Sequence, residues 1–375
     1  METYDFDKRV EAFDRLGQRM RQFGQDEPAA GTEASNAFTT LLEQAEENHP
    51  FFTPPYVRYA LREWGSNLRT NALRTWLEPY RRHFPLAEST VLLVMAGNLP
   101  LVGFHDYLCG LMAGCNLLVK LSSKDTLLLP FFHQELRKNA PLGSGLSLHE
   151  PDPVRFVAQI PDEGFHAVIA TGNNHSHAFF SRQFHHLPHL LRHSRHACAL
   201  LQGNESPEEL QALADDILLY FGMGCRSVSK LYVPENYDFQ PLIKTLAERG
   251  NNHKNNTAYM HAYASQKALM TVNGQKFLDT GFLSLVENAS LENPLSVLHY
   301  ETYRTRQEAE EQLSHQQENL QCVVGAGHLP FGIAQHPALA DYADGADTLA
   351  FLCDFYQDIC KAERKSYLCA PKNRN

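Results

Sequence analysis

The sequence lacks any run of about 20 consecutive apolar residues, which is the length that a membrane-spanning helix requires. Its first segment, residues 1–20, is polar and charged and has no apolar core of the kind found in signal peptides. Both absences favour a cytoplasmic protein with no segment inserted in a membrane.

Positive charge is scarce as well. Lys and Arg number 33 against 43 Asp and Glu, which gives a formal net charge of −10. Phosphate backbones are bound by basic faces, so this balance argues against a nucleic-acid partner. Hydrophobic residues make up 43% of a chain of 375 residues, which is ordinary for a globular protein and long enough for two domains.

Metal-binding and disulfide motifs are also missing. The eight cysteines are scattered and form no CxxC pair, and no HExxH occurs. Histidines gather between His166 and His196, but without the spacing of a structural zinc site, so we expect them on the surface and in packing, with no metal bound. In a reducing compartment a cysteine of this chain can stay a reactive thiol.

What the sequence does contain is a change of pattern near residue 90. Residues 1–85 have the three-to-four-residue apolar spacing of helices. Three short apolar runs follow, VLLVMAGNLP, NLLVKLSS and FHAVIATGNN, separated by segments long enough for helices. Such runs are typical of buried parallel strands joined by crossover helices. A second block beyond residue 197 alternates in the same way, which predicts an α/β fold.

Polar residues follow each of the three apolar runs, and parallel strands bring such ends to one edge, where ligands bind. Asn98 follows the first run and either donates to a developing oxyanion or serves as a turn-forming cap. Lys120, with the hydroxyls of Ser122 and Ser123, suits a ribose or a phosphate. The alternative is a lysine at a strand end that extends its amine to solvent and binds no ligand.

The third run ends in a glycine turn at Gly172 and Asn173. A turn of this kind before a helix presents backbone N–H groups to a pyrophosphate. The segment is not a complete GxGxxG motif, so by itself it indicates little.

Cys225 lies in the segment FGMGCRS, between a predicted helix and a predicted strand. Glycines allow the backbone to pass close to a substrate, and a cation such as Arg226 favours a thiolate. A cysteine buried in a loop is the other interpretation, because cysteine is among the residues most often found in protein interiors.

Taken in order, these segments resemble the aldehyde dehydrogenase superfamily, and more closely its acyl-CoA reductase branch, the fatty-acid reductase of bacterial bioluminescence and its relatives. The resemblance extends from about Val91 to Leu352. The segments that carry it are MAGNLPLVGFHD, AGCNLLVKLSSKD, VIATGNN, ALLQGNES, FGMGCRSVSKLYVP, LENPLSVLHY and LPFG. They are similar, in the same order, to the superfamily's N-P run, its A-G-N-x-V-x-K-P-S-E, its cofactor turn, its E-L-G-G-K, its G-Q-x-C segment, its E-x-F-G-P-V and its late P-F-G-G.

The resemblance implies an aldehyde dehydrogenase-like fold, with a Rossmann-type parallel-sheet cofactor domain and a second α/β catalytic domain. We expect a helical N-terminal segment at 1–85, an NAD(P)-binding domain at 86–197, a catalytic domain at 198–350 and a C-terminal tail at 351–375. Oligomeric state is not determined by the sequence, and a homo-oligomer stays open.

Site residues follow from the same resemblance. Cys225 matches the nucleophile, and Asn98 matches the amide that holds the oxyanion together with the Cys225 backbone N–H. Lys120, with Ser122 and Ser123 after it, matches the position that holds the adenosine ribose. Gly172 and Asn173 match the pyrophosphate turn, and Glu292 matches the glutamate on the nicotinamide ribose.

Two departures from the family pattern are informative. Hydrolytic members activate water with a glutamate before a glycine pair, whereas ALLQGNES has no carboxylate there, and Glu205 is the nearby residue that could replace it. NAD-preferring members carry a carboxylate three residues after the lysine, where this chain has Ser123 followed by Lys124. Loss of an anion and gain of a cation favour the 2′-phosphate of NADPH, with NADH left open.

The resulting hypothesis is an enzyme that reduces an acyl-CoA, or another acyl thioester, to the aldehyde through an acyl-cysteine intermediate with NAD(P)H. A protein partner that activates the acyl group is compatible with it. Two alternatives stand beside it: an aldehyde dehydrogenase working in the oxidative direction, and a nucleotide-binding subunit of a complex without turnover of its own.

Overall fold

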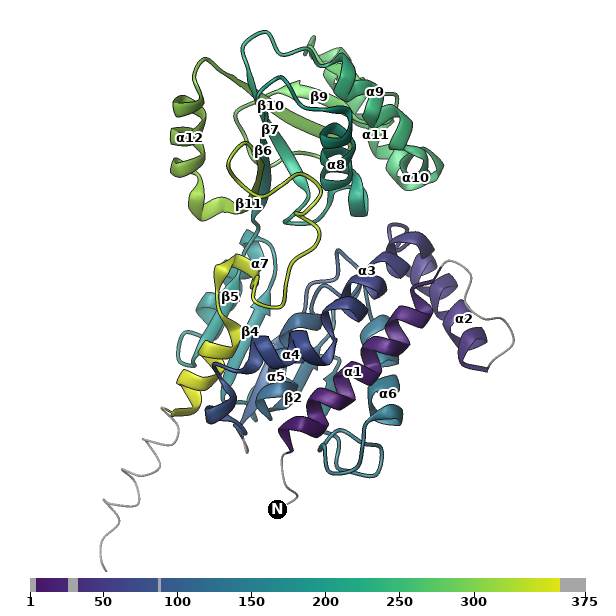
Figure 1. The fold of residues 1–375 in the computed structure, drawn as a ribbon, viewed down its shortest axis with the longest axis vertical. Coiled ribbons are helices and arrows are strands. Elements are labelled where there is room, and N and C mark those ends of the chain that lie inside the picture. Colours follow the sequence, from purple (N-terminus) through teal and green to yellow (C-terminus); the bar gives the residue numbers. More distant parts are fainter. Residues whose placement is uncertain (1–4, 26–32, 87–88, 358–375) are drawn as a thin grey trace, which may run out of the picture. The chain divides into compact units, whose positions relative to one another are not determined.

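Buried apolar strands build two sheets, one in each of two units of the chain (Figure 1). The computed structural model describes residues 5–25, 33–86 and 89–357. Unit 1 comprises residues 1–41, 57–193 and 339–375, and unit 2 comprises residues 42–56 and 194–338. Both sheets are mainly parallel and flanked by helices, which confirms the predicted α/β class. The expected domain limits stay a prediction.

The sheet of unit 1 has the order β3-β2-β1-β4-β5, and all its strand pairs are parallel. Its strands are β1 (Thr90–Val94), β2 (Asn116–Lys120), β3 (Val154–Val157), β4 (Ala167–Thr171) and β5 (His189–Arg192). Val91, Leu92 and Leu93 of β1 are almost completely buried, on both faces of the sheet, which explains why this part of the sequence is an unbroken apolar run. The chain order reverses between β1 and β4, so a crevice is expected at their carboxyl ends.

Helices cover this sheet and extend its core. They are α1 (Phe6–Phe23), α4 (Thr70–Leu77), α5 (Phe104–Ala113), α6 (Leu128–Asn139) and α7 (Asn174–Gln183), with the short turns η1 (Arg81–His83) and η4 (Ala343–Gly345). Helices α2 (Glu33–Asn48) and α3 (Pro54–Asn67) are joined by a turn that belongs to unit 2. Helix α1 is capped by the Asp5 carboxylate and buries Phe13, Leu16 and Met20.

A buried ion pair joins β5 to α5, and a hydroxyl from the last part of unit 1 contacts it. The guanidinium of Arg192, at the end of β5, donates to both carboxylate oxygens of Asp106 in α5, at 2.5 and 2.9 Å. It also donates to the Thr348 hydroxyl at 2.8 Å. The segment after residue 339 is thereby fixed to unit 1 by polar contacts as well as by apolar packing.

The sheet of unit 2 has the order β11-β6-β7-β10-β9-β8, with only the β8–β9 pair antiparallel. Its strands are β6 (His196–Leu200), β7 (Val228–Pro234), β8 (Leu278–Asp279), β9 (Ser284–Glu287), β10 (Val297–Tyr303) and β11 (Leu320–Gly325). Its helices are α8 (Pro207–Leu218), α9 (Gln240–Arg249), α10 (Asn251–Asn255), α11 (Thr257–Val272) and α12 (Arg306–His315), with the short turns η2 (Leu219–Gly222) and η3 (Gln317–Asn319).

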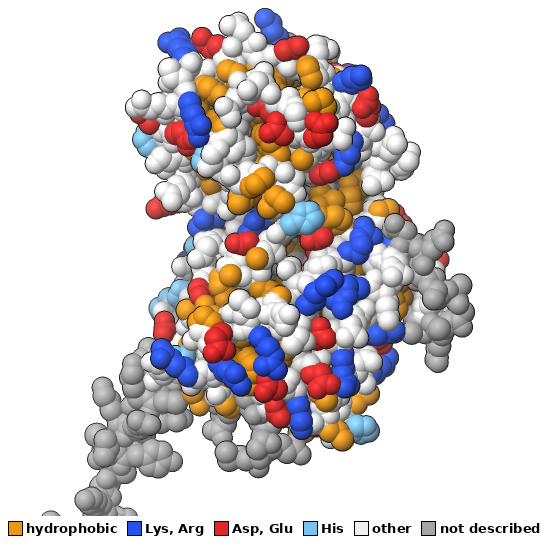
Figure 2. Space-filling view, in the orientation of Figure 1, with side chains coloured by type: hydrophobic (Ala, Val, Ile, Leu, Met, Phe, Trp, Pro, Cys, Tyr) orange, Lys and Arg blue, Asp and Glu red, His pale blue; other side chains and the backbone are white. Residues whose placement is uncertain are grey.

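Acidic and basic side chains are interspersed over the face shown in Figure 2. Within the described ranges, no helix is long and apolar enough to span a bilayer.

Candidate active site

The predicted cofactor residues of unit 1 come together at one edge of its sheet. Strands β2, β1 and β4 are neighbours and run parallel, so their carboxyl ends are adjacent. The residues that follow these ends are Asn98 after β1, Lys120, Ser122 and Ser123 at and after β2, and Gly172 and Asn173 after β4.

Two of these loops are in direct contact. A Cβ atom on Gly97 would lie 2.5 Å from the Cβ of Ser122, closer than real atoms approach. The backbone N–H of Asp125 donates to the Ser122 carbonyl at 3.2 Å and closes the β2 loop. Glycine at position 97 therefore lets the loop that carries Asn98 pack on the loop that carries Ser122.

The loop after β2 exposes its cationic residue, Lys124, and largely buries its carboxylate, Asp125. Lys124 and Ser123 are exposed, whereas the Asp125 carboxylate accepts from the backbone N–H of Leu128 at 3.1 Å and so caps α6. Burial raises the pKa of Asp125. Lys120 Nζ donates to the Leu121 carbonyl at 2.7 Å and so lies along its own loop.

The glycine turn after β4 leads directly into α7. The Asn173 side chain accepts from the backbone N–H of Ser176 at 2.9 Å and caps the helix. A Cβ atom on Gly172 would lie 2.7 Å from the Cβ of Ser176, so the turn closes tightly on the first helical turn. The N–H of Gly172 donates to the Arg192 carbonyl at 3.3 Å and so ties the turn to the end of β5.

Cys225 occupies a turn between η2 and β7 and is exposed to solvent. The other cysteines among the residues described are buried or intermediate. The turn is closed by Ser227, whose N–H donates to the Gly224 carbonyl at 3.0 Å and whose hydroxyl accepts from the Gly224 N–H at 3.2 Å. The thiol is therefore presented on a hydrogen-bonded turn.

The backbone before Cys225 is strained. Tyr220, Phe221 and Gly222 have φ values of 54°, 59° and 73°, in the left-handed region that only glycine adopts easily. Each non-glycine residue of this kind costs about 1–3 kcal/mol, and the surrounding structure must hold it in place. The Phe221 ring supplies that hold, because its centroid lies 5.1 Å from that of Phe51 and 4.9 Å from that of Tyr56.

A later loop, residues 332–335, is fastened to the same region. The completely buried Asp216 carboxylate, in α8, accepts from the N–H groups of Gly332 at 2.6 Å and Ala334 at 3.1 Å. Gln335 donates its side-chain amide to the Ser227 hydroxyl at 3.0 Å. Burial raises the pKa of Asp216 to about 6, from its usual 3.8, against the lowering effect of the two N–H donors.

Glu205 does not lie near the thiol, which corrects the expectation that it could replace the missing glutamate. Strands β6 and β7 are parallel neighbours, and Glu205 follows the carboxyl end of β6, whereas Cys225 precedes the amino end of β7. The length of a five-residue strand, roughly 16 Å, separates those edges. The Glu205 carboxylate instead accepts from the N–H groups of Gln202 at 2.5 Å and Gly203 at 3.2 Å.

Glu292, the remaining predicted residue, is exposed in the connection between β9 and β10. It belongs to unit 2, as Cys225 does. Burial lowers the pKa of His196, at the amino end of β6, and the charge of Glu292 acts in the opposite sense.

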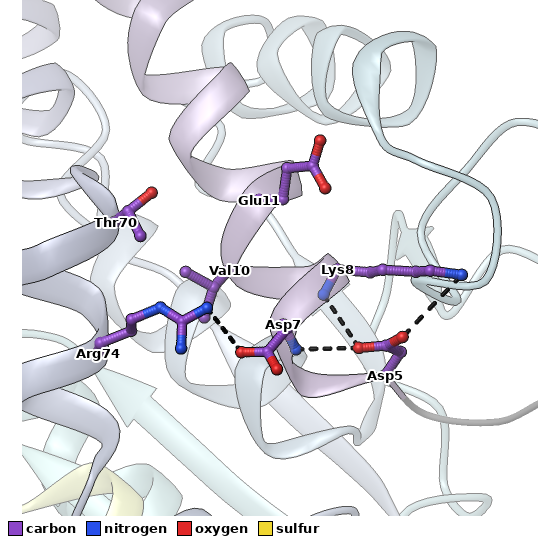
Figure 3. Close-up of a pocket in the computed structure, with 7 residues that line it drawn as sticks. All are labelled: Asp5, Asp7, Lys8, Val10, Glu11, Thr70 and Arg74. Carbon is purple, nitrogen blue, oxygen red and sulfur yellow. Dashed lines mark hydrogen bonds and ion pairs between the residues drawn. The ribbon is translucent and has the colours of Figure 1, made fainter.

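A surface recess of about 380 Å³ opens beside the start of α1 (Figure 3). It is lined by Asp5, Asp7, Lys8, Val10, Glu11, Thr70 and Arg74. Its charges are largely satisfied internally, since Arg74 pairs with Asp7 at 2.7 Å and Asp5 caps the helix. None of the predicted site residues lines it, so we do not assign the reaction to it. The described parts of the chain also hold no group of three or more residues suited to a metal ion.

Comparison with known proteins identifies the family. The sequence pattern of the acyl-CoA reductase (LuxC) family matches residues 61–288. The chain belongs to this family. As an acyl-CoA reductase family member, it is an enzyme of aldehyde-related oxidoreductase chemistry, which confirms the resemblance drawn from its motifs. No curated protein matched the chain in a direct sequence comparison.

Solved structures show the fold of this acyl-CoA reductase family member independently. Aldehyde dehydrogenase 21 from Physcomitrella patens, in complex with succinate, is similar with a TM-score of 0.61 and 12% identity, over 95% of this chain and 85% of that one. An indole-3-acetaldehyde dehydrogenase complexed with NAD+ gives 0.59 and 12%, over 94% and 83%. A Mycobacterium tuberculosis aldehyde dehydrogenase complexed with NAD+ gives 0.56 and 12%, over 88% and 74%.

Sequence reasoning missed the polar groups that fasten the site loops. Asp216 lies in an amphipathic helix and Lys230 in an apolar strand, and the local sequence pattern predicts only those elements. A charged residue in an otherwise apolar strand, as in VSKLYVP, was the available signal, because buried charges require a partner.

Proposed function

We propose that this chain reduces an acyl-CoA to the corresponding aldehyde through an acyl group held on Cys225, with NADPH as the reductant. The observation that carries the proposal is an exposed thiol on a strained glycine turn, in a member of the acyl-CoA reductase family. Solved relatives with this fold bind NAD+, which supports a nicotinamide cofactor here.

The residues of unit 1 fit such a cofactor. The edge formed after β1, β2 and β4 offers Lys120 and two serine hydroxyls for a ribose, and the amino end of α7 for a pyrophosphate. A Cβ atom on Gly97 would meet Ser122 and one on Gly172 would meet Ser176, so glycine at both positions keeps these loops closely packed at this edge. When bound, the cofactor supplies the hydride that reduces the acyl carbon.

NADPH is favoured over NADH by the charges of the β2 loop. The one carboxylate of that loop, that of Asp125, is engaged by the backbone N–H of Leu128 at 3.1 Å. Ser123 and Lys124 are exposed in its place, and a cation attracts a 2′-phosphate where a carboxylate would repel it.

The chain's own chemistry begins with the Cys225 thiolate, which attacks the thioester carbonyl and forms a carbon–sulfur bond. The negative charge that develops on the carbonyl oxygen is assigned, by the family resemblance, to the Asn98 amide and the Cys225 backbone N–H. The bond to coenzyme A then breaks and its thiolate leaves. After reduction, the bond to Cys225 breaks, the aldehyde departs and the thiolate is restored. The sum is acyl-CoA, NADPH and a proton converted to aldehyde, coenzyme A and NADP+.

The oxidative alternative is disfavoured by the placement of Glu205. A hydrolytic enzyme needs a base for water beside the acyl-cysteine, and Glu205 lies at the opposite edge of the sheet, bound to its own loop. The segment that enters β6, residues 189–196, contains no carboxylate. An acyl group on Cys225 would thus persist until it is reduced or returned to coenzyme A.

The experiment is incubation of the protein with a panel of acyl-CoAs, with NADPH or NADH, while cofactor oxidation and aldehyde are measured. We expect acyl-CoA-dependent oxidation of NADPH, and a mass increase equal to one acyl group on Cys225 when the cofactor is omitted. A Cys225→Ala variant that reduces acyl-CoA at the wild-type rate would refute the proposal.

A further inference from the structure

Three consecutive backbone carbonyls, those of residues 289–291, accept hydrogen bonds from three side chains of the neighbouring strands. The donors, in the order of the carbonyls, are Nζ of Lys230 at 2.6 Å, Nδ1 of His299 at 2.9 Å and Oγ of Ser229 at 3.1 Å. Ser229 and Lys230 belong to β7 and His299 to β10. We refer to these three side chains as the loop clamp.

The loop clamp is almost completely buried, with exposed fractions of 1% for Lys230, 4% for His299 and 5% for Ser229. Lys230 and His299 are register partners on adjacent strands, and Lys230 also pairs with the Glu301 carboxylate at 2.5 Å. Burying an amine and an imidazole is costly unless each has a polar partner. Hydrophobic residues would pack these strand positions at lower cost, so the polar set is explained by the loop that it holds.

The proton on His299 follows from its partner. A carbonyl oxygen can only accept, so Nδ1 of His299 must carry the proton in the bond to Ser290. Burial lowers the pKa of His299, which keeps the ring neutral. The clamp thus presents an amine, an imidazole N–H and a hydroxyl to the three carbonyls.

What the clamp holds is the short segment that ends at Glu292. Leu291 packs its side chain into a core cluster with Cys198 and Tyr232, while its carbonyl is bound by Ser229. The N–H of Glu292 donates to the Ser290 hydroxyl at 3.1 Å, and that hydroxyl donates to the Glu292 carbonyl at 3.0 Å. The backbone of Glu292 is therefore fixed, while its side chain is exposed.

We propose that Ser229, Lys230 and His299 are positioning residues that act through Glu292 on the bound cofactor, an inference that rests on the proposed function. Cys225 enters the same strand that carries two of them, only five residues before Lys230. Strand β7 thus follows the thiol turn directly and contacts the Glu292 loop through its second and third residues. Loss of the clamp should impair cofactor binding and reduction of the acyl group, but not the formation of acyl-Cys225.

The first variant is Lys230→Met, which keeps the length of the side chain and removes the donor. We expect at least a tenfold rise in the NADPH dissociation constant, measured by fluorescence titration, and at least a tenfold slower single-turnover reduction of pre-acylated enzyme. The rate of acylation by acyl-CoA without cofactor, measured by intact mass, should stay within twofold of wild type. Amide hydrogen exchange of residues 288–293 should accelerate.

Two substitutions of His299 distinguish loss of the clamp from a general failure to fold. His299→Phe removes the donor at nearly constant volume, whereas His299→Asn retains an N–H donor close to the position of Nδ1, so only the first should show the cofactor defect. Lys267→Met is the matched control, because it breaks another lysine–carboxylate pair of unit 2, the one with Asp279 at 2.6 Å, whose residues are not part of the clamp. It should match wild type in all four measurements.

Each outcome decides between the ideas. Acylation that falls as much as reduction in Lys230→Met would overturn the positioning role, as would normal NADPH affinity, or a His299→Asn variant as defective as His299→Phe. Wild-type protein that forms no acyl adduct on Cys225 would instead remove the proposed function, and with it the basis of this inference.

Discussion

Cys225 differs from the buried cysteines in its exposure to solvent. Burial raises the pKa of Cys115 and of Cys198 to about 12, so these thiols stay protonated at neutral pH. Only a thiolate is a strong nucleophile, and Cys225 alone among the described cysteines is exposed. Exposure to solvent therefore distinguishes the candidate nucleophile from the cysteines that serve as small apolar side chains.

This contrast predicts selective alkylation. With limiting iodoacetamide at pH 7.5, Cys225 should react at least tenfold faster than Cys115 or Cys198, and prior incubation with an acyl-CoA should protect it. Peptide mass mapping over time gives the individual rates. Equal labelling of Cys225 and Cys198 would contradict the difference in exposure between the two residues.

Cofactor choice is also a matter of single residues. Ser123→Glu restores a carboxylate to an exposed position of the β2 loop, where it would repel a 2′-phosphate. We expect the ratio of kcat/KM for NADPH to that for NADH to fall at least tenfold, which corresponds to about 1.4 kcal/mol. Ser123→Gln is the matched control of similar size without charge and should change the ratio much less.

At the scale of elements, the strained turn η2 is held by aromatic packing. Phe221 is buried against rings from the 42–56 segment and from α10 and α11, including His253 at a centroid distance of 5.0 Å. The packing energy of the Phe221 ring offsets the cost of its left-handed backbone. A variant without the ring should therefore also lose the left-handed conformation.

Phe221→Ala tests this balance. Removing a buried phenylalanine costs about 3–5 kcal/mol, and relaxation of the turn should also slow the acylation of Cys225. Urea unfolding gives the first quantity and intact mass the second. Phe179→Ala, at a ring that is 50% exposed on α7, should lower the free energy of unfolding by less than about 0.5 kcal/mol.

The attachment of the 332–335 loop to α8 carries a pH dependence. The folded-state pKa of Asp216 is raised to about 6, above its usual 3.8. A raised carboxyl pKa contributes stability that is complete below pH 3.8 and is lost as the pH rises through 6. The side chain in Asp216→Asn cannot ionise, so the variant lacks this pH dependence. The stability difference, defined as the free energy of unfolding of wild type minus that of the variant, should fall by about 2 kcal/mol between pH 4 and pH 7. A difference independent of pH, measured by urea unfolding, would refute the assignment.

On the scale of the whole molecule, the chain returns after residue 339 to the unit in which it began. The buried Arg192–Asp106 pair, with Thr348, is the polar part of that return. A buried charge left without its partner costs about 3–5 kcal/mol, whereas replacing both partners by apolar groups costs far less.

Arg192→Met should therefore destabilise the protein by roughly 3–5 kcal/mol, because it leaves the Asp106 carboxylate buried and unpaired. The double variant Arg192→Met with Asp106→Leu should regain most of that loss in chemical denaturation. Equal stability of the single and double variants would show that the pair is not what holds this region.

Much of the framework was determined by the sequence alone. The apolar runs that became β1, β2 and β4 predicted parallel strands, because strands buried on both faces must be apolar throughout. Their polar ends placed Asn98, Lys120 and Asn173 at one edge, since parallel neighbours end on the same side. The order of the motifs indicated the family.

Only the tertiary structure decided which residues of unit 2 lie at which edge of its sheet. The order of the motifs suggested that Glu205 could replace the missing glutamate near Cys225. The direction of the strands instead places Glu205 a full strand length away from Cys225. The donors that hold the Glu292 loop, and the carboxylate that holds residues 332–335, come from distant parts of the chain. Hydrogen bonds between such segments depend on strand register and burial, and local spacing in a sequence contains neither.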